Sequence, residues 1–314
     1  MRVISIIVFI ATLGIFAPSA HAIVLPEAGL TPESPFYFAD LWDENLRIFL
    51  TLNSAKRIRL RMLAAAERLA EAYEIAGRGI VAVEHAIELY GGSLTVGLAG
   101  AAATGDAALI AETAQVVNDH MSFFDEISER TPFDQKLFVV LAKEDSIDKQ
   151  GDALRTLLSI DTSSALQIYT QAVAGRFARV RKVAIDKENI REALREYEKY
   201  ALLGEDIEND ARSSKEIEGD NVTRVVKNAF AGHYALLENE VLKKLRPQDD
   251  DQFRNTMRAV AMLLDIPIVE PEVSPVEENM EEVENPKEKP SATSSTNPPV
   301  EEGTTPPPPP PPAF

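Results

Sequence analysis

The sequence contains no cysteine and only one tryptophan in 314 residues. Without cysteine there can be no disulfide, no thiol nucleophile and no metal site built on thiolates, so the fold must depend on core packing alone. About 240 residues between the two chain ends are enough to bury a sizeable core without a covalent cross-link.

Proline is almost absent from the middle of the chain. Residues 36–131 and 133–246 contain none, whereas most of the 20 prolines lie in 267–314. Proline interrupts helix interiors, and the two proline-free stretches are rich in strong helix formers. Alternating strand patterns with turn signals are not evident. The sequence therefore predicts an all-α fold, an antiparallel helical bundle.

Signatures of catalysis are also missing. The chain has no Gly-x-Ser-x-Gly elbow, no His-Glu-x-x-His motif and no Glu-x-x-His pair of the kind that di-iron bundles use. We therefore expect neither an enzyme nor a cofactor. The net charge of −18 argues against nucleic acid and against anionic lipid headgroups as partners. It leaves polycations or divalent cations open, although charge of this size can simply keep a chain in solution.

The first 22 residues have the three parts of a secretory signal peptide. Arg2 precedes an apolar run from Ile4 to Ala17, and an A-x-A site ends at Ala22. We expect cleavage between Ala22 and Ile23, with an uncleaved N-terminal anchor as the alternative. The protein is then exported, to the periplasm, the cell envelope or the extracellular space. After signal removal we expect no stable membrane span, because no later apolar run is long enough.

The stretch GLTPESPFYFADLW at 29–42 predicts the first helix of the body. Ser34 and Pro35 are typical of a cap and a first helical residue, and the helix should continue to about Leu52. Its apolar residues recur at steps of three and four, which indicates one face. That face consists of Phe38, Leu41, Trp42, Leu46, Phe49 and Leu50. We expect it to be buried and to tie the start of the chain to the body.

Four further helices are predicted in the first half. One, capped by Asn53, continues to about residue 76, where glycines stop it. The next, at about 80–102, should be interrupted at Gly91 and Gly92. Another spans 106–130, and Pro132 opens the fifth. The glycine-rich stretch 91–105 lacks the Lys-Ser/Thr of a phosphate loop, so we interpret it as a small-residue helix or turn that permits close backbone approach.

Two segments of the chain resemble each other. HMSFFDEISERTP at 120–132 and HYALLENEVLKKLRP at 233–247 share a histidine, an apolar pair, an acid, a charged stretch and a proline. Their spacing of about 113 residues indicates two related helical repeats, at 23–160 and 161–266. The histidines hold equivalent positions. His120 and His233 either pack and hydrogen-bond within helices, or form a paired cation or pH-sensing site between the halves.

The last segment, 267–314, differs in composition from the rest. It is acidic and proline-rich, it has few apolar residues, and residues 306–312 are seven consecutive prolines. Such a segment cannot bury enough apolar surface to order itself, so we predict a disordered tail that ends in a polyproline II rod. Its role is either a spacer or a docking segment for a proline-binding partner.

The first two predicted helices carry a resemblance to a known family. The pattern L-x-P-x-S-P-x-Y begins at Leu30, and A-x-x-R-L-A-E-A runs from Ala65 to Ala72 as AAERLAEA. This resembles the opening of a bacterial family of exported or membrane-tethered helical proteins that is catalogued as a domain of unknown function. The resemblance implies a helical fold and export, and it implies no activity.

Together these features predict an exported, non-catalytic helical protein of the envelope or the extracellular space. It would act in interaction or structure, with an unknown protein or an envelope polymer as partner. The alternative is a helical bundle that binds a cation or a small ligand and acts as a sensor or carrier.

Overall fold

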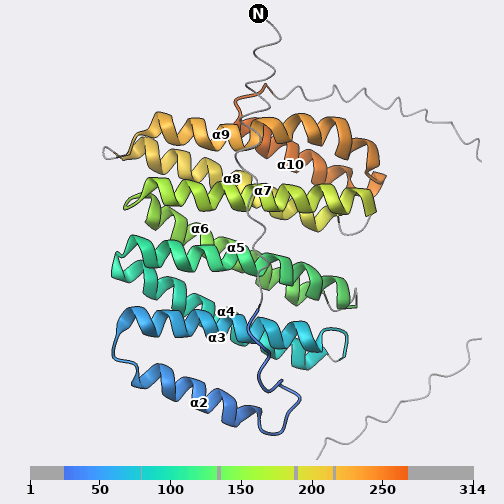
Figure 1. Ribbon diagram of the computed structural model, residues 1–314. Coiled ribbons are helices and arrows are strands. Elements are labelled where there is room, and N and C mark those ends of the chain that lie inside the picture. The colour runs from blue at the N-terminus through green and yellow to red at the C-terminus, as the bar shows by residue number, and fades with distance from the viewer. Residues whose placement is uncertain (1–24, 79, 133–135, 187–189, 215–216, 268–314) are drawn as a thin grey trace, which may run out of the picture. The chain divides into compact units, whose positions relative to one another are not determined.

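The computed structural model describes residues 25–267, except residues 79, 133–135, 187–189 and 215–216. This part of the chain contains helices and no strand, as predicted (Figure 1). The α-helices are α2 (Tyr37–Leu50), α3 (Ser54–Ile75), α4 (Ile80–Thr104), α5 (Ala107–Arg130), α6 (Leu137–Leu158), α7 (Thr162–Asp186), α8 (Ile190–Ser213), α9 (Gly219–Leu236) and α10 (Asp250–Leu263). Short π and 3₁₀ turns join α9 to α10. The signal peptide, its cleavage site at Ala22 and Ile23, and the tail from residue 268 onward lie outside the described residues.

The predicted helix ends in the first half are confirmed where capping chemistry defines them. Asn53 accepts the backbone N–H of Lys56 at 2.8 Å, and Asp106 caps α5 in the same way. Gly77 follows α3 with a positive φ of 85°, a conformation that glycine adopts without steric cost. The sequence therefore determines these boundaries locally.

Two predicted features of the helices are wrong. The first helix begins at Tyr37 and not at Pro35, because the backbone N–H of Tyr37 bonds to the carbonyl of Ser34 in a turn that precedes it. The next difference is that α4 runs without interruption through Gly91 and Gly92. Two glycines cost a helix only about 2 kcal/mol. Burial of the flanking Tyr90 and Leu94, both 0 % exposed, outweighs that cost.

The helices are stacked as hairpins in two layers. Each helix from α3 to α8 packs against its successor in the chain, and alternate helices pack side by side. One layer consists of α3, α5, α7 and α9, and the other of α4, α6, α8 and α10. The order along the stack can be followed in Figure 1, where α2 lies beyond α3 at one end. As a result, α2 has α3 as its main neighbour within the described residues.

Side-chain contacts show how the layers are held in register. Arg59 and Tyr73 on α3 each bond to a glutamate on α5 that lies 53 residues further along the chain. Alternate helices therefore run parallel. Between layers, a Cβ atom on Gly97 would lie 2.5 Å from the sulfur of Met62. The helix interpretation of the stretch 91–105, with close backbone approach, is confirmed.

Within the described ranges, no helix has both the length and the apolar character needed to cross a membrane.

Candidate functional site

The predicted apolar face of the first helix is exposed. Phe38 is 71 % exposed, Trp42 69 % and Phe49 78 %. Leu46 and Leu50 are exposed beside them. These five side chains are called the α2 face from here on. The expectation that they would be buried is wrong, and the helix instead presents a contiguous apolar surface within the described part of the chain.

The opposite side of α2 makes the contact with the body. Tyr37 and Ile48 are buried, and Asp40, Leu41 and Glu44 are half-buried. These positions recur at three- and four-residue steps, so α2 has a second stripe that periodicity alone could have revealed. That stripe mixes aromatic, acidic and aliphatic residues. This stripe packs against the body because a buried cation on α3 binds its polar side chains.

The buried cation is Arg68, which is 2 % exposed. Its guanidinium donates to the hydroxyl of Tyr37 at 2.8 Å and to the carboxylate of Glu44 at 3.1 Å. The same Tyr37 hydroxyl donates to Glu71 at 2.9 Å, and Glu71 is 0 % exposed. Burial raises the pKa of Glu71 to about 7, against the opposing effects of Arg68 and the Tyr37 hydroxyl. This network fixes α2 on α3 and leaves the α2 face outward.

Basic side chains lie beside the α2 face. Residues 45–66 contain five Lys and Arg and no Asp or Glu, in a chain whose net charge is −18. One of the five, Arg59, pairs with Glu112 on α5. Among the described residues, no carboxylate lies within ion-pair distance of the other four. These four, Arg47, Lys56, Arg57 and Arg61, are called the basic corner from here on. The net charge of the whole chain does not reveal this corner, although the acid-free run signals it in the sequence.

A hollow of about 380 Å³ lies against the basic corner. Arg57 and Arg61 line it from α3, and Val96, Gly100 and Thr104 line it from α4. No carboxylate is part of its wall. The hollow thus combines positive charge with an apolar and small-residue floor, which suits a small anionic group.

A second buried charge cluster lies in the middle of the stack. Asp125, Glu192 and Glu196 bring carboxylate oxygens within 4.8 Å of one another, a spacing at which acids hold metal ions. Lys143, which is 1 % exposed, forms ion pairs with all three. Arg176 adds a bond to Glu196 at 3.0 Å. Because an ammonium group already lies among the acids, the cluster is a structural ion network that joins α5, α6, α7 and α8.

The two candidate histidines each pair with a tyrosine. His120 Nδ1 lies 3.3 Å from the hydroxyl of Tyr90, and His233 Nδ1 lies 3.0 Å from that of Tyr197. The first pair joins α4 and α5, the second joins α8 and α9, and α7 lies between α5 and α9 in their layer. The structure therefore does not bring the histidines together. The recurrence of the pair in both halves favours the predicted repeats, whose boundaries stay a prediction.

Burial controls the charge of both histidines. It lowers the pKa of His120 to about 4, and it lowers that of His233 to about 4 with a further contribution from Arg181. Both rings are therefore neutral at pH 7. A hollow of about 260 Å³ between α3 and α5 reaches His120 and the nearby Asp119.

Replacing His120 with glutamine is expected to reduce the loss of stability at low pH. The folded pKa of His120 lies below the unfolded value of about 6.5, so the unfolded chain binds protons first as the pH falls. The contribution of neutral His120 to the free energy of unfolding is therefore fully present above the unfolded pKa, and it is lost as the pH falls toward about 4. Between pH 7 and pH 5, urea unfolding of the wild type should lose about 2 kcal/mol more than the variant. An equal loss in both proteins would contradict a buried neutral His120.

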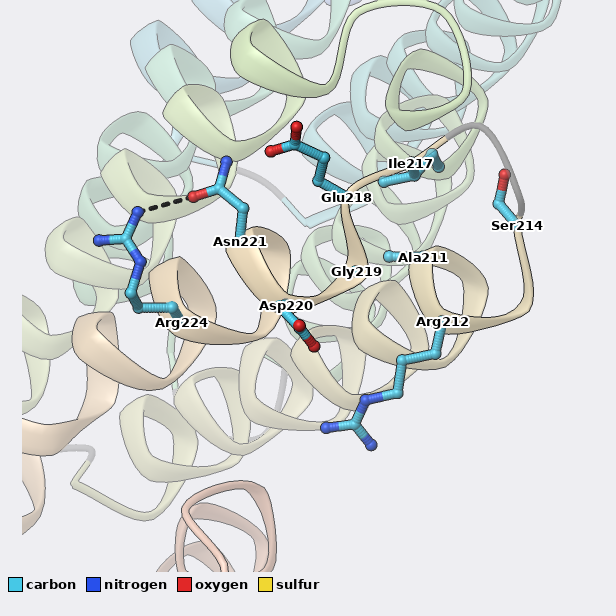
Figure 2. A pocket seen from close by; sticks show the side chains of 9 residues that line it. All are labelled: Ala211, Arg212, Ser214, Ile217, Glu218, Gly219, Asp220, Asn221 and Arg224. Atoms are coloured by element: carbon cyan, nitrogen blue, oxygen red, sulfur yellow. Dashed lines mark hydrogen bonds between the residues drawn. The ribbon is translucent and has the colours of Figure 1, made fainter.

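A hollow of about 840 Å³ lies at the turn between α8 and α9. Arg212, Glu218, Asp220 and Arg224 line it together with smaller residues, and Arg224 donates to Asn221 at 2.7 Å (Figure 2). Its charges are mixed and the turn includes residues 215–216, outside the description. Nothing in this lining selects a class of ligand.

Comparison with known proteins finds a family match for part of the chain. No curated protein and no solved structure matches the chain. A family model does match, and the matched region takes in α2, with its exposed face, and continues through α5. The resemblance drawn from Leu30 to Ala72 is thus confirmed: residues 29–134 match the family described as a domain of unknown function (DUF5667).

Proposed function

We propose that this protein is an exported, non-catalytic helical protein of the cell envelope or the extracellular space, and that it docks a partner through the α2 face. The observation that carries the proposal is the exposure of five neighbouring apolar side chains on one helix. Soluble monomeric proteins rarely leave such a patch open unless it binds something. Trp and Phe are also the residue types that anchor interfaces most often.

The way α2 is held supports a docking role. Arg68, Tyr37 and Glu71 fix the helix through short, buried hydrogen bonds. A rigid helix presents its side chains in one arrangement, so that little conformational entropy is lost when a partner binds. A helix held only by weak contacts would offer the same residues with lower affinity.

The alternative of a cation or small-ligand carrier has less support. The acidic cluster of Asp125, Glu192 and Glu196 already holds the ammonium of Lys143. Each candidate histidine has one ring nitrogen against a tyrosine hydroxyl, in a separate part of the stack. No described feature favours this function over docking.

Export is the part of the proposal that rests on the sequence. The apolar run and the A-x-A site at Ala22 support it. Mass spectrometry of the protein recovered from cells tests it directly, because a processed chain would begin at Ile23. Recovery of only the full-length chain from the cytoplasm would contradict export.

A photo-crosslinking side chain placed at Phe49 tests the docking face in cells. We expect adducts with a partner, whether protein, polymer or lipid, because Phe49 is 78 % exposed at the C-terminal end of the α2 face. The matched control is the same side chain at Ile185 on α7, a single exposed apolar residue at 66 %. Adducts from neither position, or equal adducts from both, would count against the α2 face as the docking surface.

A further inference from the structure

Charge is distributed unevenly over this protein. The chain as a whole carries −18, yet residues 45–66 carry five positive charges and no negative one. The basic corner and the α2 face lie in this one segment or next to it. Of the exposed acids on α2, Asp43 lies toward the N-terminal half, ahead of the acid-free run. From residue 45 onward, α2 and the turn after it therefore carry a basic side chain and no acid.

Two contacts between α2 and α3 determine where the apolar side chains of α2 lie relative to the basic side chains of α3. Tyr37 bonds to Glu71, and further along Asn45 accepts from Arg61 at 3.4 Å. This antiparallel register brings Phe49 and Leu50 alongside Arg57 at the start of α3. Leu52, in the connecting turn, is 95 % exposed. Large apolar side chains thus project next to Lys56 and Arg57, for which the described part of the chain shows no ion pair.

We infer that the partner of the α2 face is an anionic lipid surface, an inference that rests on the docking role proposed above. Helices that lie in a membrane interface place Trp, Phe and Leu at the boundary between headgroups and acyl chains. Lys and Arg beside them add attraction to anionic lipids. The α2 face supplies the first element and the basic corner the second. The hollow between Arg57 and Arg61 is of a size to receive a lipid phosphate.

The acidic remainder of the protein fits this arrangement. An anionic membrane repels the rest of the surface and attracts the basic corner, so that the molecule approaches with α2 leading. The net charge disfavours anionic lipids only where it is spread evenly over the surface. The local charge at α2 favours the opposite, because Lys56 and Arg57 lie beside the exposed apolar residues.

Vesicle binding tests the inference on the chain from Ile23, which keeps every described residue. The lipids are phosphatidylcholine alone, or the same lipid mixed with phosphatidylglycerol. Trp42 is the one tryptophan, and at 69 % exposure it is a built-in reporter. We expect flotation with the anionic vesicles, a blue shift of Trp42 emission and protection from acrylamide. Binding should weaken as salt is raised and should be much weaker on phosphatidylcholine.

Variants with matched controls separate the two contributions. Replacing Lys56 and Arg57 with glutamine is expected to weaken binding about 30-fold, at about fivefold for each cation near the surface. The same replacement of Lys243 and Lys244, exposed cations before α10, changes the net charge equally and should have little effect. Phe38→Ser with Phe49→Ser should weaken binding by about tenfold or more, and Leu137→Ser with Ile185→Ser should not. All these side chains are exposed, so circular dichroism should remain unchanged.

The outcomes distinguish failure of this inference from failure of the docking role. Equal binding to both vesicle types, or equal loss in the Lys243 and Lys244 control, overturns the lipid assignment. Absence of vesicle binding also overturns it. Sedimentation then tests for self-association. If the protein self-associates and the double variant with Phe38→Ser and Phe49→Ser does not, the α2 face remains a docking surface, with a second copy of the chain as the partner. A monomer that binds no vesicle and gives no crosslink at Phe49 overturns both proposals.

Discussion

Replacing Lys143 with methionine is expected to lower the free energy of unfolding by about 3–5 kcal/mol. The side chain is 1 % exposed, and its ammonium forms ion pairs with the carboxylates of Asp125, Glu192 and Glu196. Methionine keeps most of the volume, so the loss comes from two buried acids and the half-buried Glu192, which are left with too little positive charge. Urea unfolding at pH 7 measures the change.

Two comparisons show whether charge causes that loss. Lys149→Met, on the same helix, removes an ion pair with Asp145 that lies near the surface, and it should cost less than about 1 kcal/mol. The deficit of Lys143→Met should also shrink as the pH falls, because carboxylates that have lost their cation take up protons at higher pH. A deficit that stays constant between pH 8 and pH 5 would indicate a packing defect instead.

Replacing Arg68 with methionine is expected to cost about 3 kcal/mol and to release α2 from the body. The substitution removes the donor to Tyr37 and Glu44 and leaves Glu71 buried without its cation. Because α2 packs mainly on α3 at the end of the stack, much of the effect should be local. Hydrogen exchange should show faster exchange of the amides of residues 37–50.

The control for Arg68→Met is Arg61→Met on the same helix. Arg61 is half-buried and makes one long hydrogen bond of 3.4 Å to Asn45, so its loss should cost less than about 1 kcal/mol. Amides in α6 and α7 should keep their protection in both variants. If α2 stays protected in Arg68→Met, the network around Arg68 does not hold the helix.

Helix ends and helix content could be predicted because they depend on nearby residues. Asn53 and Asp106 cap the helices that follow them, and Gly77 ends α3 through its own backbone conformation. The uninterrupted α4 could not be predicted in this way. Its continuity depends on burial of Tyr90 and Leu94 against other helices, which no local signal at Gly91 and Gly92 contains.

The α2 face shows the limit of periodicity. An amphipathic pattern identifies a stripe, but it does not say whether the stripe faces the core or a partner. Here Arg68 on α3 decides between the two, because it donates hydrogen bonds to Tyr37 and Glu44 and so holds their side of α2 against the body. Phe38, on the other side, is exposed. Arg68 is 31 residues from Tyr37 and 24 residues from Glu44 in the chain, so these hydrogen bonds depend on the tertiary structure.

The sequence by itself determined the helical class, the capped boundaries, the close backbone approach that the small residues of 91–105 permit and the resemblance to a domain of unknown function, because each depends on composition or short-range chemistry. Only the tertiary structure decided how hairpins stack, which side of α2 is exposed, that His120 and His233 lie apart, and that Lys143 lies among three acids. The physical reason is that burial and charge pairing are set by residues that meet across helices, at separations in the chain that local patterns do not encode.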